Sequence, residues 1–172
     1  MEGSNRPGLT VGTRVVYGSH GVGRVVAVQT AAGDRREAVL LEFGDGLTVT
    51  LPLERASLSL RPLAARGDLA RVEEVLQGDR AVDSQPWSRR LRAMQEKVAA
   101  GDILGWAEIV RDGIKGEQAR GEKGGALAAP SERRLYLKAR ALLAAEVAAV
   151  REIDGSEADA WIVERVTQPP PG

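Results

Sequence analysis

The chain has 172 residues, of which 43% are hydrophobic and 28% charged, and its 24 basic and 24 acidic side chains give a formal net charge of zero. These values are typical of a globular protein with one ordinary domain or two small ones. The chain contains no cysteine, which excludes disulfide frameworks, zinc fingers and thiol chemistry and fits a reducing compartment. No apolar stretch is long enough to span a bilayer, and the first residues lack the features of a signal peptide. We therefore expect a cytoplasmic protein without membrane contact.

The first third of the chain has the pattern of short β-strands. Runs rich in β-branched and aliphatic residues alternate with glycine- and aspartate-containing turns about every 8–12 residues, as in a small antiparallel barrel or sheet. A module of this size, Tudor- or SH3-like, leaves at least one edge strand open to a partner. The predicted strands lie within residues 11–17, 24–28, 38–43, 47–52 and 58–60.

From Asp68 onward, apolar residues recur at helical spacing. The first two predicted helices end at Gly78 and Gly101, because glycine is favoured just after a helix. Asp102 is a predicted N-cap for a third helix through Ile114.

The last third contains one loop and two more predicted helices. A charged, glycine-rich loop is expected over residues 116–130. Ser131 is the predicted N-cap of the longest helix, and Ser156 with Asp159 resembles a capping box for the final one. A proline-rich tail follows.

The predicted fold class is α+β. A small β-barrel over residues 1–62 is followed by an all-helical bundle over residues 63–172. Trp106 and Trp161 lie among apolar neighbours at helical spacing, so both are expected to pack within the bundle.

The chain shows no constellation typical of a catalytic site. Its one histidine, His20, lies in a glycine-rich turn. Gly21 and Gly23 join two strands and lack the lysine and the following helix of a phosphate loop. No cluster has metal-ligand spacing. An enzyme is the least favoured class, and we expect no cofactor and no metal.

Two basic segments stand out although the net charge is zero. Residues 80–100 and 131–140 are both rich in arginine and lysine. Local charge governs contact with phosphate, because salt screens distant charges within about 8–10 Å. Each segment is either a solvated helix face or a nucleic-acid contact.

Trp87 follows Pro86 and directly precedes a basic run. Pro86 disfavours helix before it, so Trp87 is expected at or near a helix start, with Ser88 as a candidate cap. Either the indole fixes the helix end to the core, or it inserts at a base step while the arginines contact phosphates. The neighbouring basic residues are Arg89, Arg90 and Arg92.

Several motifs together resemble those of the CarD/CdnL family of bacterial transcription regulators. They occur in family order from about residue 9 to 150, in both halves of the chain. The motifs are Val11-Gly12-Thr13-Arg14-Val15-Val16-Tyr17, His20-Gly21-Val22-Gly23, Leu47-Thr48-Val49-Thr50-Leu51-Pro52, Trp87-Ser88-Arg89-Arg90, Ala100-Gly101-Asp102-Ile103, Ala107-Glu108-Ile109-Val110-Arg111-Asp112 and Lys138-Ala139-Arg140.

The resemblance implies two partners. A Tudor-like N-terminal module would bind the RNA polymerase β subunit through an exposed strand, with Ala31, Thr48 and Thr50 at the polymerase-facing positions. The helical domain would contact promoter DNA without sequence specificity, at the upstream edge of the melted region, and stabilise the open complex. Trp87 would be the minor-groove wedge there. The basic side chains implied to contact phosphates are Arg89, Arg90, Arg92, Arg133 and Lys138.

The chain departs from the family pattern in a few places. Family members often have basic residues where this chain has Ala31 and Thr50. Gly113 and Gly116 interrupt a helix that is usually richer in tryptophan and arginine. The alternative function is a protein-only adaptor, in which the β module binds polymerase or another partner and Trp87 is structural. Whether Trp87 is exposed beside Arg89, Arg90 and Arg92 distinguishes the two hypotheses.

Overall fold

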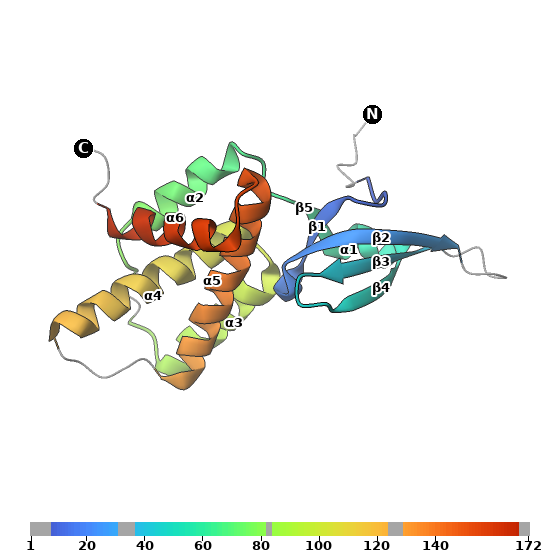
Figure 1. The fold of residues 1–172 in the computed structure, drawn as a ribbon. Coiled ribbons are helices and arrows are strands. Elements are labelled where there is room, and N and C mark those ends of the chain that lie inside the picture. Colours follow the sequence, from blue (N-terminus) through green and yellow to red (C-terminus); the bar gives the residue numbers. More distant parts are fainter. Residues whose placement is uncertain (1–7, 31–36, 82–83, 124–128, 169–172) are drawn as a thin grey trace, which may run out of the picture. The chain divides into compact units, whose positions relative to one another are not determined.

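The computed structural model describes residues 8–30, 37–81, 84–123 and 129–168. Its internal contacts divide the chain into two compact units, Met1–Leu63 and Ala64–Gly172. The first unit holds a β-sheet and one short helix, and the second is made of helices (Figure 1). The predicted α+β class, a β module followed by a helical bundle, is confirmed.

The first unit is a five-stranded antiparallel sheet with strand order β4-β3-β2-β1-β5. The two outer strands, β4 and β5, are therefore its edges. The sheet surrounds a small apolar core that includes Val15, Val25, Val39 and Leu41. Its elements are β1 (Arg14–Tyr17), the 3-10 turn η1 (Gly18–His20), β2 (Val22–Thr30), β3 (Glu37–Phe43), β4 (Thr48–Pro52), helix α1 (Leu53–Ser59) and β5 (Leu60–Pro62).

The strand predicted at residues 58–60 is mostly wrong. Residues 53–59 form α1, and only Leu60 begins β5. The residues that follow Pro52 favour helix. The small side chain of Ala56 is fully buried in the core of this unit, and its packing stabilises the helical turn. Leu58 lies on the other side of this turn and is 89% exposed.

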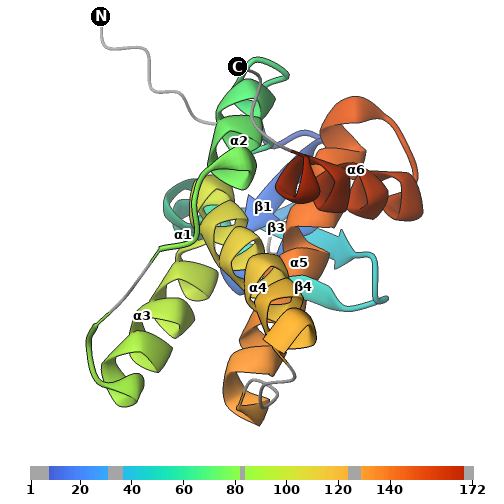
Figure 2. The same ribbon diagram turned by 90° about the vertical axis from the view of Figure 1, so that its left-hand side faces the viewer.

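Five helices make up the described part of the second unit. Figure 2 shows α4 beside α5, and α3 contacts both. The helices are α2 (Asp68–Gln77), α3 (Trp87–Ala100), α4 (Ile103–Lys123), α5 (Pro130–Arg151) and α6 (Gly155–Thr167).

The predicted helix ends at Gly78 and Gly101 are confirmed. Gly101 adopts a left-handed conformation with φ 73°, which glycine allows without strain. Asp102 Oδ1 accepts a hydrogen bond from the Leu104 backbone N–H, as an N-cap does.

Three other boundary predictions are wrong. The expected loop at residues 116–130 begins later, because α4 continues to Lys123. Helix α5 begins at Pro130, with Ala129 and not Ser131 at its N-cap. The capping box of α6 joins Asp154 and Glu157 instead of Ser156 and Asp159.

The core of the second unit forms around Trp106. This side chain is fully buried, and its indole N–H donates to the Val98 carbonyl at 3.3 Å. Trp161 is half-buried, and the Cζ atoms of Arg151 and Arg165 lie 5.3 and 5.4 Å from its ring centroid. Both tryptophans therefore pack within the bundle, as predicted.

Within the described ranges, no helix is long and apolar enough to cross a membrane. Among the same residues, no group of three or more histidine, aspartate or glutamate side chains could hold a metal ion.

Candidate nucleic-acid interface

Trp87 is the first residue of α3, and its side chain is 46% exposed. The preceding Pro86 has φ −54° and ψ 146° and occupies the N-cap position. Proline fixes its own φ and keeps the residue before it out of the helix, so α3 begins where the sequence predicts. A large aromatic surface thus remains accessible at a helix start.

The N-terminus of α3 follows a residue that cannot cap it. Pro86 at the N-cap has no side-chain hydrogen bond to offer, and the first turn contains no acidic residue. Ser88, the candidate cap, is the second residue of the helix and does not cap it. Free N–H groups and the helix dipole give this end a partial positive charge that attracts anions.

The three arginines of this helix do not share one face. A helix turns about 100° per residue, which places Arg89 and Arg92 roughly 160° and 140° from Trp87 around the axis. Arg90 lies about 60° from Trp87, on the side of the helix that faces the bundle. Arg89 and Arg92 are exposed, whereas Arg90 is half-buried. Only Arg90 is therefore adjacent to the indole on the helix surface.

Arg90 is held by neighbouring groups. Its Nη1 donates to the Gln85 carbonyl at 3.4 Å, and its Nη2 lies 4.0 Å from Oε1 of Glu132 in the first turn of α5. This contact brings the N-terminal turns of α3 and α5 together.

On α5 the structure separates the predicted basic residues. Arg133 lies 3.8 Å from Oε1 of Glu117, measured from Nη1, and is thereby directed toward α4. Lys138 is exposed. Arg134 is also exposed, one turn before Lys138 on the same face, with the 45% exposed Leu137 beside them. Arg134 is absent from the predicted set, although its i, i+4 spacing to Lys138 was a visible signal.

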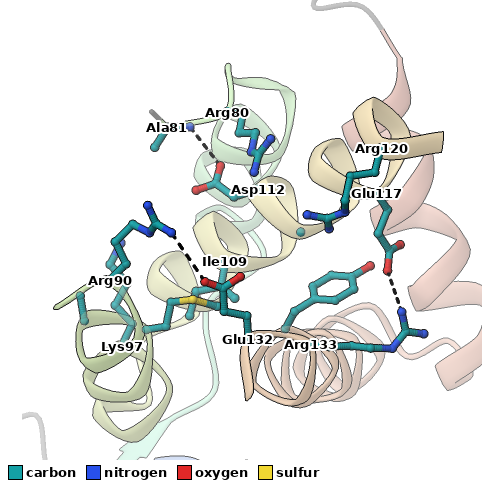
Figure 3. A pocket seen from close by; sticks show the side chains of 14 residues that line it. Arg80, Ala81, Arg90, Lys97, Ile109, Asp112, Glu117, Arg120, Glu132 and Arg133 are labelled. Carbon is teal, nitrogen blue, oxygen red and sulfur yellow. Dashed lines mark hydrogen bonds and ion pairs between the residues drawn. The ribbon is translucent and has the colours of Figure 1, made fainter. Parts of the chain in front are cut away.

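A cavity of about 470 Å³ lies where α3, α4 and α5 meet (Figure 3). Arg90 and Arg133, both predicted DNA contacts, line it. Gly113 of α4 allows the Tyr136 ring to pack against this helix, because a Cβ at residue 113 would lie 2.2 Å from the ring. The glycine that seemed to interrupt α4 instead lets α5 approach it closely.

A polar network supports this wall of the cavity. Arg140 donates from Nε and Nη2 to the two carboxylate oxygens of Asp159, both at 2.7 Å, and from Nη1 to the Tyr136 hydroxyl at 2.9 Å. The hydrogen bond from Arg140 lowers the pKa of Asp159 below its usual range. Burial raises the pKa of Tyr136, so its hydroxyl stays protonated.

The predicted polymerase-facing residues lie in the first unit. Thr48 and Thr50 are exposed on β4, an edge of the sheet. Ala31 lies outside the described residues. His20 ends the 3-10 turn and stacks on Tyr17, with ring centroids 5.1 Å apart. This is the turn position that the sequence predicts for the histidine.

Each of the two units matches a known protein-family model. A family model described as "CarD-like/TRCF RID domain" matches residues 9–64, and one described as "CarD, C-terminal domain" matches residues 71–163. A Bacillus subtilis (strain 168) protein named "Putative transcription factor YdeB" is 25% identical over 106 residues, which cover 59% of this chain and 69% of that protein. The chain therefore belongs to the CarD family of transcription regulators.

Proposed function

We propose that this protein binds the β subunit of RNA polymerase through its β module and stabilises the promoter open complex through its helical unit. In this proposal the start of α3 contacts DNA at the upstream edge of the melted region. The protein has no catalytic role.

One observation carries the proposal. Trp87 combines 46% exposure with a place at a helix start whose N-cap is a proline and whose first turn contains no acidic residue. Trp106, which packs in the core, is fully buried, whereas nearly half of Trp87 is exposed. Apolar side chains that wedge between base steps usually act together with groups that hold the phosphates. The protein-only adaptor requires a structural Trp87, and the exposure of the indole speaks against it.

In this proposal the basic side chains orient the protein on DNA through phosphate contacts and do not recognise the base sequence. The exposed Arg89 and Arg92 extend from α3 on the side away from the bundle. Lys138, with Arg134, offers a second contact from α5. Arg90 and Arg133 already contact carboxylates at 4.0 and 3.8 Å, so their contribution to phosphate binding requires those pairs to rearrange.

The edge strand β4 is the proposed contact with polymerase. Its neighbour on one side is β3, and no described strand pairs with its other side. An edge of this kind binds a partner by adding a strand to the sheet. The exposed Thr48 and Thr50 would lie beside the partner strand.

Tethering explains how a protein of zero net charge acts on DNA. Once one unit is bound to polymerase, the other meets the promoter at a high effective concentration, so weak contacts suffice. Little affinity for free DNA is needed.

The test is photo-crosslinking from position 87. Trp87 is replaced by benzoylphenylalanine, and open complexes with polymerase and promoter DNA are irradiated. We expect crosslinks to DNA at the upstream edge of the melted region. The same photoreactive residue at the exposed Arg71 of α2 is the control. Complexes that form normally and crosslink equally from both positions would refute the assigned interface.

A further inference from the structure

Two arginines that line the cavity between α3, α4 and α5 approach each other over Gly116 of α4. A methyl group placed on Gly116 would lie 3.3 Å from Nη2 of Arg80 and 3.4 Å from Nη2 of Arg120. Both side chains line the cavity, and Figure 3 shows them entering it from the side opposite Glu132 and Arg133. Like charges repel, so an anion that contacts both guanidinium groups would stabilise this arrangement.

No carboxylate of the described residues supplies that anion. The three acidic side chains that line the cavity are Asp112, Glu117 and Glu132. Asp112 accepts from Arg111 at 2.8 Å and from the Ala81 backbone N–H at 3.2 Å. The two glutamates contact Arg133 and Arg90. Arg80 and Arg120 form no ion pair in the part of the chain that the structure describes.

The segment that carries Arg80 is fixed in place by α4. Arg111 Nη1 donates to the Val75 carbonyl at 3.5 Å, and Lys115 Nζ donates to the Gly78 carbonyl. The hydrogen bond from Ala81 to Asp112 holds the next residue. The backbone at Arg80 therefore does not have to be ordered when a ligand binds, which lowers the entropic cost of binding.

The rest of the cavity is suited to an apolar group. Ala93 and Met94 of α3 and Ile109 of α4 contribute aliphatic surface, and Tyr136 of α5 contributes a ring. The cavity volume of about 470 Å³ falls within the range of roughly 300–1,000 Å³ that is usual for small-molecule sites. A single inorganic anion would leave most of this space empty.

We propose that this cavity binds a nucleoside phosphate or an organic phosphate of similar size. Its phosphate groups contact Arg80 and Arg120, and its base or other apolar body lies along Met94 and Ile109. Guanidinium groups recognise phosphate oxygens in bidentate fashion. The cavity shares Arg90 and Arg133 with the proposed DNA contacts, whereas the phosphate contacts Arg80 and Arg120 are not among them.

Methionine NMR tests the proposal directly. The chain has two methionines, and Met94 lines the cavity. Full-length protein carrying 13C-methyl methionine is titrated with ATP, ADP, pyrophosphate and a short DNA duplex in separate experiments. We expect ATP and ADP to shift the Met94 methyl signal saturably and pyrophosphate to bind more weakly, because it lacks the apolar body. Absence of a Met94 shift at millimolar nucleotide overturns the proposal.

Charge-neutral variants locate the phosphate. Arg80→Gln and Arg120→Gln should each weaken ATP binding about tenfold, the effect of losing roughly 1.4 kcal/mol. The control Arg71→Gln makes the same change of charge outside the cavity and should bind ATP normally. Equal weakening in all three variants would show only general charge attraction and would overturn the site. Binding of the duplex but not of the nucleotides, with the same dependence on Arg80 and Arg120, would assign the cavity to DNA backbone and also overturn the proposal.

Discussion

Trp87 and Trp106 have the same side chain in opposite environments. Trp106 is fully buried, and its indole N–H is satisfied by the Val98 carbonyl. Trp87 leaves nearly half of its surface in water. The two residues therefore offer a matched comparison between packing and function.

Replacement by alanine should separate them. Trp106→Ala should destabilise the protein by about 3–5 kcal/mol, because it leaves a cavity and an unpaired carbonyl. Trp87→Ala should cost only about 1 kcal/mol, since much of the indole is already exposed. Urea unfolding monitored by circular dichroism measures both values. Equal destabilisation by the two substitutions would make Trp87 a core residue and support the adaptor hypothesis.

The pair Arg140–Asp159 makes stability depend on pH. Asp159 has a lower pKa in the folded than in the unfolded protein, because Arg140 donates two hydrogen bonds to its carboxylate. Its contribution is therefore present above the unfolded pKa of about 3.9 and is lost as the pH falls through the folded value.

Asp159→Asn tests this dependence. At neutral pH the variant should be less stable by about 0.5–1 kcal/mol, the range for a well-oriented pair that water reaches. The difference from the parent protein should shrink as the pH falls below about 4. Unfolding free energies across this pH range measure it, with the exposed Asp79→Asn as control. A difference that stays constant down to pH 2 would contradict the assigned role of the carboxylate.

Sequence could predict the start of α3 but not the contacts of its arginines. Proline restricts the backbone locally, so Pro86 alone indicates where Trp87 begins the helix. The pairs Arg90–Glu132 and Arg133–Glu117 join different helices. Such pairs depend on how the helices pack, which no local pattern encodes.

At the level of elements, competing local signals explain the wrong boundaries. Asp154 and Glu157 have the same spacing as Ser156 and Asp159, and the longer glutamate side chain reaches back to the N-cap backbone N–H at 3.2 Å. The glycines of α4 suggested a loop, yet Gly113 accommodates the Tyr136 ring and the helix continues. Tertiary packing overrides low helix propensity there.

A substitution on the edge strand β4 should increase the affinity for polymerase, which loss of folding cannot do. The CarD resemblance implies a basic residue at the position of Thr50, which our proposal places against polymerase. Thr50→Arg should therefore tighten binding to the polymerase β subunit by about twofold to fivefold, and Thr50→Glu should weaken it, the effect of one exposed charge pair.

Binding of full-length protein to the isolated β-subunit lobe measures the effect. Ser59→Arg adds the same charge at an exposed position of α1 and should leave the affinity unchanged. Equal effects of Thr50→Arg and Ser59→Arg, or a reversed order of the two Thr50 variants, would count against a contact through β4.

For the whole molecule, the change of sequence period revealed the two units. Alternating runs predict a sheet and a 3.6-residue period predicts helices, so both the α+β class and the order of the units follow from the pattern. Composition did not reveal the function, because the net charge sums over patches that act separately. The central claim, that Trp87 stabilises melted promoter DNA, belongs to the complex with polymerase and must be tested there.

The most direct measurement is the lifetime of the open complex with parent protein and with Trp87→Ala. An indole stacked at a disrupted base step contributes roughly 1–3 kcal/mol, so its loss should shorten the lifetime by roughly tenfold to a hundredfold. Binding of the variant to the polymerase β subunit should be unchanged. The same variant must also unfold near normally in urea, which separates loss of contact from loss of structure. A stable Trp87→Ala protein that binds polymerase and leaves the open-complex lifetime unchanged would contradict the account.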